Sequence, residues 1–277
     1  MPVNARTFVR KMRGGAQAHL LQADDDRFYV VKFQNNPQHP RILVNEVIAT
    51  EILHQLQIDA PQHSFINLSP EFLADHPEVH MQLGSQKVPV KPGWHFASRF
   101  PGDPHLLTVY DFIPDTMLPQ VANIEQFLGV LVFDKWVANA DGRQSIFFRA
   151  KLDDWLSKPG IPPRKLGFVA LMIDHGYAFN GPKWTLPDSP LAGLYGRRCV
   201  YENVSSIDQF QPWLDRVRTF PEAAIDRALS HIPPEWIGND EPELLRLMEA
   251  LMRRRDRIAD LLLLSRKAAC NPFPLWR

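Results

Sequence analysis

The chain has 277 residues, with 31 Lys or Arg and 31 Asp or Glu, so its formal charge at pH 7 is zero when His is neutral. Proteins that bind duplex DNA or anionic membranes usually carry a clustered basic excess, because neutralised phosphates supply much of their affinity. The charge balance therefore argues against nucleic acid as a partner. Hydrophobic residues make up 45% and charged residues 22%, which excludes disordered, collagen-like and coiled-coil chains.

The remaining composition indicates the compartment. Cys199 and Cys270 are far apart in sequence, and two cysteines in so long a chain favour a reducing cytoplasm over a disulfide scaffold. Residues 1–13 lack the apolar core of a signal peptide. The longest apolar runs, 127–133 and 261–264, are far shorter than the ~20 residues that a spanning helix needs. We therefore expect a cytoplasmic protein without a membrane span.

The first hundred residues predict strands around one helix. The predicted elements are a hairpin of residues 16–22 and 27–34, a helix over 41–57 and a strand over 94–100. Three aspartates supply the polar turn of the hairpin, and apolar residues recur at helical spacing in the helix. Residues 64–92 carry only a weak pattern. The Pro-Gly-Asp-Pro run at residues 101–104 has the composition of a hinge.

The rest of the chain is mainly helical. The predicted elements are a buried helix over 124–137, a strand pair at 145–148 and 168–173, a loop over 158–164, a long ordered loop over 177–201, and helices over 207–218, 221–231 and 241–264. Asn239 and Asp240 are candidate caps of the last helix. The sequence thus predicts an α+β fold, with a small β-rich lobe, a hinge and a larger helical lobe.

A lysine lies in the middle of an apolar strand. Lys32 has apolar neighbours on both sides within residues 29–33, so its ammonium needs a polar partner such as a carboxylate or a phosphate. The alternative is an edge-strand lysine whose charged head reaches water.

Glu46 is a candidate partner for this lysine. It shares one stripe of the next helix with Ile42, Ala49 and Leu53. A strand lysine paired with a helix glutamate orients the nucleotide phosphates in protein kinases. The alternative is that Glu46 lies at the boundary of a helix with broad apolar coverage.

Two aspartates follow structured segments. Asp141 comes just after the buried helix, where a carboxylate on a firmly held loop can accept a proton from a substrate hydroxyl. Asp174 ends an apolar strand and precedes Gly176 by two residues, the Asp-x-Gly arrangement that holds Mg²⁺ in kinases. An Asp-Gly turn and a strand-end turn are the alternatives. Together with Gly14 and Gly15 near the hairpin, these signals occur in the order found in kinases.

The sequence resembles the HipA-like kinases, a branch of the protein-kinase and phosphatidylinositol-kinase superfamily named after a bacterial persistence toxin. The resemblance covers residues 13 to about 264, and it is carried by residues 15–19, 30–33, 45–46, 98–100, 141–143 and 173–176. It implies a bilobal protein-kinase-like fold, with an N-lobe over residues 1–100 and a C-lobe over residues 101–277 that together form one kinase domain. ATP and Mg²⁺ are the implied cofactors.

The resemblance also implies a role for each site residue. Gly14, Gly15 and Gln17 would cover the nucleotide phosphates, Lys32 would hold them and Glu46 would orient Lys32; backbone groups of the Ser98-Arg99-Phe100 segment would meet adenine, Asp141 would be the base, and Asp174 would bind the metal. The expected activity is transfer of the γ-phosphate to a hydroxyl acceptor by a Ser/Thr-type kinase. That acceptor, a protein or a small molecule, is unknown.

One position departs from the kinase pattern. Kinases place a metal-binding Asn five residues after the catalytic Asp, and this chain has Ile146 there. Either Gln144 or Ser145 reaches the second metal, or one metal binds, or the chain binds nucleotide without transferring phosphate. The alternative function is therefore a pseudokinase, a nucleotide-binding or interaction module. We attribute the long gap between Asp141 and Asp174 to an insertion at residues 151–165.

Overall fold

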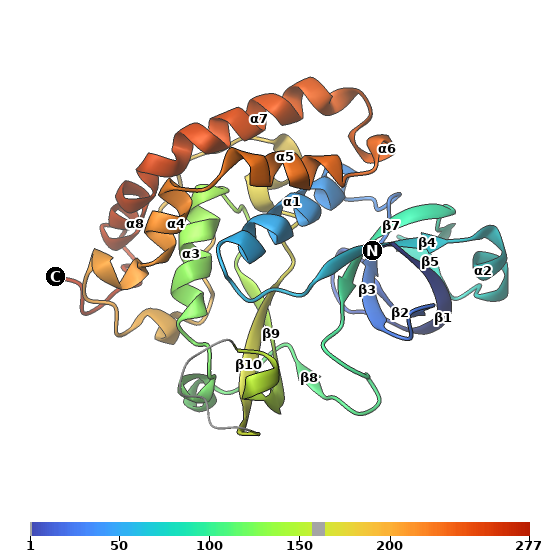
Figure 1. Ribbon diagram of the computed structural model, residues 1–277, viewed down its shortest axis with the longest axis horizontal. Helices are drawn as coiled ribbons and strands as arrows, with labels where there is room; N and C mark the ends of the chain where they lie inside the picture. The colour runs from blue at the N-terminus through green and yellow to red at the C-terminus, as the bar shows by residue number, and fades with distance from the viewer. Residues whose placement is uncertain (1, 157–163) are drawn as a thin grey trace.

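Five strands close into a barrel in the N-terminal part of the chain (Figure 1). Around the barrel they follow the order β1, β2, β3, β7 and β4, and the parallel pairing of β1 with β4 closes it. The strands are β1 (Val3–Lys11), β2 (His19–Ala23), β3 (Phe28–Lys32), β4 (His63–Leu68) and β7 (Gly93–Arg99). The computed structural model describes residues 2–156 and 164–277.

The barrel interior is apolar because alternate residues of its strands point inward. Leu21, Val31, Ile66 and Ala97 are fully buried in one cluster there. The predicted hairpin and the strand before the hinge are confirmed as β2, β3 and β7. The weakly patterned residues 64–92 contain most of β4, helix α2 (Pro70–Asp75) and a hairpin of β5 (His80–Leu83) and β6 (Gln86–Pro89).

Helix α1 (Arg41–Gln55) follows β3 and packs against the helical body. Its contacts include α5 (Glu222–Ser230) and α6 (Pro234–Ile237), which lie next to it in Figure 1. The residues from Ile42 to Thr50 are all buried. The predicted helix is confirmed, and its burial on every side explains why its apolar stripe was broad.

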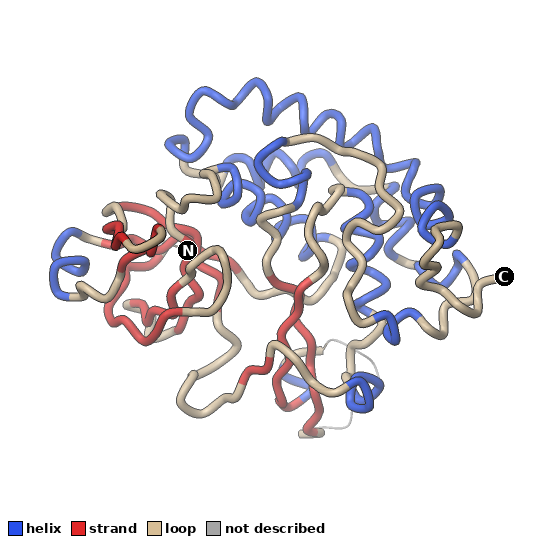
Figure 2. Tube along the Cα trace, turned by 180° about the vertical axis from the view of Figure 1, so that it is seen from behind, coloured by secondary structure: helices blue, strands red, loops and turns tan. Residues whose placement is uncertain are grey.

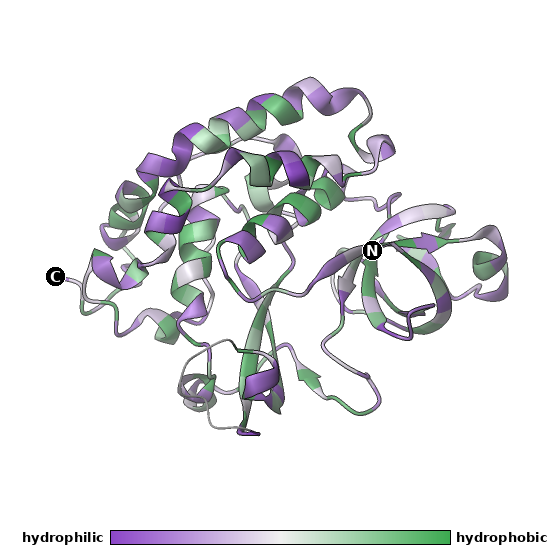
Figure 3. Ribbon diagram, in the orientation of Figure 1, coloured by the Kyte–Doolittle hydropathy of each residue, from purple (hydrophilic) through white to green (hydrophobic). Residues whose placement is uncertain are grey.

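The helical body is built around α3 (Gln126–Trp136), the confirmed buried helix. It packs against α4 (Trp213–Arg218) and α8 (Ile258–Arg266), and the last long helix is α7 (Glu241–Arg253). One face of α7 buries Leu244, Leu247 and Leu251, and the helix alternates between apolar and polar colours in Figure 3.

Two of the predicted helices are wrong in part, because each includes a 3₁₀ turn. Residues 207–210 form a 3₁₀ turn before α4, and a second 3₁₀ turn at residues 254–257 separates α7 from α8. Asp240 stands at the N-cap position of α7 but makes no capping hydrogen bond. Its Oδ2 instead accepts from Arg41 Nε at 2.7 Å, because a charge-assisted contact with α1 competes for the same carboxylate.

A three-stranded sheet of β10, β9 and β8 lies beside α3 (Figure 2). Strands β9 (Gln144–Lys151) and β10 (Leu166–Ile173) form the predicted strand pair, and β8 (Val109–Tyr110) is the outer strand. One face, with Phe147 and Met172, joins the main core, and the other carries a separate apolar cluster. Because β9 and β10 pair antiparallel, Gln144 lies opposite Ile173 at the end nearest α3's carboxyl terminus.

Two sequence predictions remain, one about a loop and one about membrane spans. The predicted loop over 158–164 lies, except for its last residue, outside the described residues. In the described part of the chain, every helix is too short or too polar to cross a membrane.

A buried histidine predicts how the stability of the barrel depends on pH. His95 on β7 accepts from Gln34 N through Nδ1 at 3.0 Å and contacts Lys91 O through Nε2 at 2.9 Å, and burial lowers its pKa to about 4. The unfolded chain binds a proton here near pH 6.5 and the folded chain does not, so stability falls as pH drops between these values. From pH 7 to 5 we expect a loss of about 1–2 kcal/mol from this group. Urea unfolding of His95→Gln should lack that component, whereas exposed His105→Gln should keep it.

Candidate active site

Lys32 lies between two carboxylates that come from other elements. Its Nζ donates to Glu46 Oε1 on α1 and, at 2.7 Å, to Asp174 Oδ1 just after β10. The side chain of Lys32 is 10% exposed and that of Glu46 only 3%. The edge-strand alternative for Lys32 is therefore wrong, and the expected Lys32–Glu46 pair is confirmed.

The two carboxylates decide the charge of the cluster. Burial alone would lower the pKa of Lys32, but Glu46 and Asp174 hold it above its usual value. Burial would raise the pKa of Asp174, and Lys32 outweighs it, so this pKa falls below its usual range. Lys32 and Asp174 are both ionised at neutral pH. Asp174, whose side chain is 33% exposed, is the carboxylate open to solvent.

Helix α1 also holds the turn that follows Asp174. Asp174 has a left-handed backbone, with φ of 59°, which costs a non-glycine residue roughly 1 kcal/mol. Asn45 Nδ2 donates to Gly176 O at 2.8 Å and to Ala178 O at 3.0 Å. A Cβ on Gly176 would lie 2.5 Å from Ile42 Cγ2, so only glycine allows this approach. Asn45, the residue before Glu46, thus fixes the turn after Asp174.

Asp141 and Gln144 lie at the same end of the β9–β10 hairpin as Asp174. Gln144 Nε2 donates to Asp141 Oδ2 at 3.3 Å, and both residues are exposed. Gln144 lies opposite Ile173, the residue before Asp174. Asp141 Oδ1 accepts from Gly142 N at 2.7 Å, so the Asp-Gly turn is present together with these contacts.

Beneath this loop lies a buried ion pair that the sequence analysis missed. Arg143 donates to both carboxylate oxygens of Asp134, through Nε at 2.9 Å and through a second N–H, and both side chains are fully buried. A further N–H of Arg143 donates to Ile173 O at 3.0 Å. One signal could have revealed the pair, namely an acid that directly follows the apolar run 127–133 within the predicted buried helix.

The expected glycine turn is present between β1 and β2, but the Gln17 side chain does not point to the Lys32 cluster; it pairs with Gln82. Gly14 has a positive φ of 117°, and Gln17 N donates back to Gly14 O at 3.2 Å. The Gln17 amide donates to Gln82 O at 2.8 Å and accepts from Gln82 N at 2.6 Å. The side chain is therefore engaged with the β5–β6 hairpin and does not join the Lys32 cluster.

The segment expected to meet adenine, residues 98–100, lies at the end of β7. Ser98 and Arg99 belong to β7, and Arg99 N donates to Gln62 O at 2.8 Å. Phe100 N donates to Phe28 O at 2.8 Å, so this amide is already paired. The chain leaves the barrel only at Pro101, after the β3 and β7 backbones separate.

Ile146 is packed inside the sheet. It pairs with Leu171 in the sheet and lies in the apolar cluster that also contains Phe148. An apolar side chain in this cluster has no ligand atom to offer. Gln144, at the start of the same strand, is the polar residue that pairs with Ile173, next to Asp174.

The predicted long loop over residues 177–201 is ordered and includes two 3₁₀ turns. Lys135 Nζ donates to the carbonyl oxygens of Ser189, Pro190 and Ala192 at 3.1, 2.9 and 2.8 Å. Burial lowers the pKa of Lys135 to about 8, so it is still mostly protonated at pH 7. Its charge and position tie the loop to the end of α3.

The oxygen donors at this site suit a hard cation. In the described residues there is no group of three or more His, Cys, Asp or Glu side chains placed to hold a metal. Asp174 offers a carboxylate and Gln144 an amide oxygen, and Mg²⁺ typically takes one or two protein ligands while phosphates and water complete its shell. The donor set therefore fits a metal that binds together with a nucleotide.

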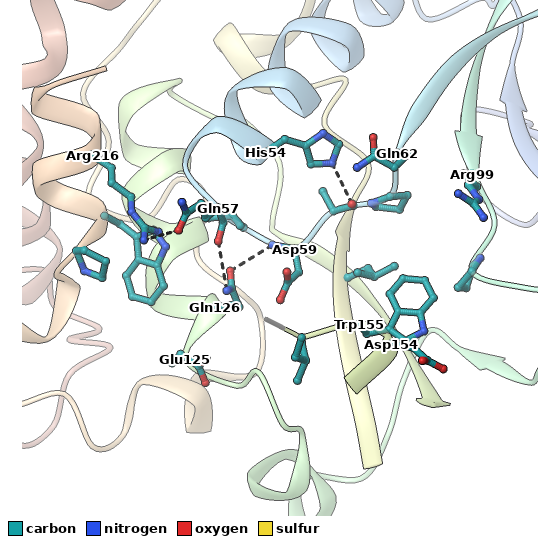
Figure 4. Close-up of a pocket in the computed structure, with 18 of the residues that line it drawn as sticks. His54, Gln57, Asp59, Gln62, Arg99, Glu125, Gln126, Asp154, Trp155 and Arg216 are labelled. Atoms are coloured by element: carbon teal, nitrogen blue, oxygen red, sulfur yellow. Dashed lines mark hydrogen bonds between the residues drawn. The ribbon is translucent and has the colours of Figure 1, made fainter. Parts of the chain in front are cut away.

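A separate cavity of about 1090 Å³ opens between α1, α4 and the end of β7 (Figure 4). Its lining includes Arg99 and Phe100 but none of Lys32, Glu46, Asp141 or Asp174. Several lining groups satisfy one another, as in the 2.6 Å contact from Arg216 to Gln57 Oε1. This cavity is not part of the cluster around Lys32.

Comparison with known proteins identifies the family. The profile of the HipA-like kinase family matches residues 6–147, and the chain belongs to that family. None of the curated proteins compared with the chain matches it significantly.

Two similar solved structures have the same fold. They are the Golgi casein kinase with Mn/ADP bound (TM-score 0.53, 13% identity, 95% of this chain and 73% of the other) and hydra Fam20 with sugar (TM-score 0.55, 10% identity, 96% and 86%). The chain therefore has a kinase-like mixed α+β fold, and its barrel is the β-rich part.

The contact between the loop and α3 makes Gly193 irreplaceable. Gly193 has a φ of 73°, and a Cβ built on it would lie 2.2 Å from Asp134 Cβ. We expect Gly193→Ala to lower the free energy of unfolding by about 2–4 kcal/mol, because backbone strain adds to overpacking. Gly196→Ala, with nothing within 4 Å of its Cβ, is the control and should change stability little. Equal denaturation midpoints for the two variants would contradict this packing.

Proposed function

We propose that the chain is an ATP- and Mg²⁺-dependent phosphotransferase that moves the γ-phosphate of ATP to a hydroxyl group, as a Ser/Thr-type kinase does. The observation that carries the proposal is the Lys32 ammonium shared by Glu46 and Asp174. Membership of the HipA-like kinase family and the kinase-like fold support it. The Golgi casein kinase structure contains Mn and ADP, which supports a nucleotide and a divalent metal as ligands.

Lys32 would bind the nucleotide phosphates, and Glu46 would keep its ammonium in place. The buried Glu46 carboxylate has no better partner than Lys32, so the lysine stays oriented when its contact with Asp174 is exchanged for a phosphate. Asp174 would then be released to ligate Mg²⁺. Mg²⁺ held by Asp174 would supply positive charge against the charge that develops on the phosphates.

Asp141 would accept the proton of the acceptor hydroxyl. Its carboxylate is exposed and accepts from Gln144 Nε2, and the Gln144 amide oxygen would be a second ligand of the metal. Positioning and electrostatics carry most of the catalysis in phosphoryl transfer, so a correctly placed carboxylate suffices as base.

The nucleotide would lie between two lobes, the N-lobe over residues 1–100 and the C-lobe over residues 101–277. Backbone amides near Gly14 and Gly15 would cover its phosphates, and the Gln17 side chain would support that turn through Gln82. Ser98 lies opposite Val30 in the barrel and Phe100 N is paired with Phe28 O, so the adenine contacts would come from the remaining polar groups of the Ser98-Arg99-Phe100 segment and from backbone groups just after it.

The acceptor and the compartment belong to the proposal as well. The acceptor would be a protein or a small molecule with a free hydroxyl. Cys199 and Cys270 are both free thiols, which supports a reducing cytoplasm as the site of action.

The role of Asp141 is tested by Asp141→Asn. We expect the variant to bind ATP as tightly as the wild type while autophosphorylation falls by at least ~10²-fold, because the base is lost and the phosphate-binding groups are intact. Radiolabelled ATP measures transfer, and calorimetry measures binding. Asp111→Asn, an exposed aspartate after β8, is the matched control. Wild-type transfer by Asp141→Asn would exclude this residue as the base.

The role of Asp174 is tested through the metal. Mg²⁺ should tighten ADP binding to the wild-type chain, and Asp174→Asn should remove most of that gain because a neutral amide binds a hard cation weakly. ADP binding without metal should change far less. The measurement is calorimetric titration of ADP with and without Mg²⁺. An undiminished metal effect in the variant would argue against Asp174 as ligand.

A pseudokinase is the second candidate, favoured by the apolar surroundings of Ile146. It predicts stabilisation by ATP and Mg²⁺ in a thermal shift experiment without phosphate transfer to the chain or to added acceptors. Transfer that disappears in Asp141→Asn supports the kinase instead.

A further inference from the structure

The carboxylate of Asp134 is connected to both loops of the candidate site, through Asn139 and through Arg143. It lies near the end of α3, with a fully buried side chain, and accepts from Arg143 through both oxygens. It also accepts from Asn139 Nδ2 at 2.9 Å. Three N–H donors from the segment after α3 therefore bond one carboxylate. Asp134 itself is not among the residues expected to bind the nucleotide or the metal.

One connection runs from Asp134 to Asp141. Asn139, held by Asp134, accepts from Asp141 N through its Oδ1 at 3.1 Å. Asn139 N also donates to Asp134 O at 3.0 Å. The backbone of Asp141 is thus set by the side chain of Asn139, and that side chain is set by Asp134.

A second connection runs from Asp134 to Asp174. Arg143, clamped by Asp134, donates to Ile173 O at 3.0 Å and contacts His175 Nδ1 at 2.9 Å. Ile173 and His175 are the two neighbours of Asp174 in sequence. The guanidinium therefore grips the chain on either side of the proposed metal ligand.

Stability alone does not account for this arrangement. A buried ion pair costs desolvation and is often no more stabilising than apolar residues of similar size. A bidentate guanidinium–carboxylate contact instead fixes direction, because its planar fork allows few orientations. The Arg143–Asp134 contact can therefore set the distance between the loop that carries Asp141 and the turn that carries Asp174.

We propose that Asp134 is a positioning residue that sets the spacing of Asp141 and Asp174 through Asn139 and Arg143. This inference rests on the proposed function, since it takes these two aspartates as base and metal ligand. Asp134 does not contact the reacting groups. Its loss should uncouple metal binding from nucleotide binding more than it weakens the nucleotide itself.

The test uses the full chain, with ADP and Mn²⁺ as probes. The quantity is the ratio of the ADP dissociation constants without and with Mn²⁺. In Asp134→Asn, where one oxygen becomes an amide that cannot accept from Arg143, we expect the ratio to fall at least tenfold. The dissociation constant of ADP alone should change less than twofold. Arg143→Lys, which keeps the charge but not the fork, should show the same pattern and serves if Asp134→Asn does not fold.

The matched control is Asn123→Ala. Asn123 is also fully buried and bonds β10 at Ala170, through its Nδ2 to Ala170 O at 2.8 Å and through its Oδ1 from Ala170 N at 2.9 Å. It should lower the melting temperature without changing the ratio. If Asp134→Asn keeps the wild-type ratio, or if the control loses it equally, the inference is overturned. A wild-type ratio near one would contradict the proposed function itself.

Discussion

The Lys32 ammonium is the interaction on which the site depends, because it joins the barrel, α1 and the end of β10 at one buried point. Each of these elements places one charged group there that would be costly to bury alone. The cost is lowest when all three meet, so the cluster favours the arrangement in which the barrel sits over the carboxyl end of β10. The same condition leaves Asp174 ionised and partly exposed, where a ligand can compete for Lys32.

The sequence predicted this cluster because its signals are local. A lysine inside an apolar strand and an acid inside an apolar helix are each improbable without a partner. In the structure Lys32 and Glu46 form an ion pair with each other. The helical stripe by itself was uninformative, since α1 is buried almost all round. The charged residue in an apolar setting was the useful signal. The same reasoning applied to Asp134 in α3 would have pointed to its partner Arg143.

What could not be predicted depends on pairing between distant segments. Strand β1 is mostly exposed and polar, and it is a strand because β2 and β4 supply hydrogen bonds on its two edges. Gln17 is separated from Gln82 by 65 residues, so its contact with the β5–β6 hairpin has no local sequence signal. The position of Phe100 likewise depends on how far the pairing with β3 extends. Each of these is a property of the closed barrel and not of the segment.

Ile146 shows how loop length alters a pattern read by counting. Strand β9 begins at Gln144, three residues after Asp141, so the fifth residue is already inside the sheet and its side chain belongs to the apolar cluster. The residue that faces Asp141 is Gln144, and its register opposite Ile173 brings it toward Asp174. In the proposed kinase, a shorter catalytic loop would therefore move the polar ligand from the fifth position to the third. The apolar residue at position 146 is then a consequence of where the strand starts, and it does not by itself indicate that the site has lost its chemistry.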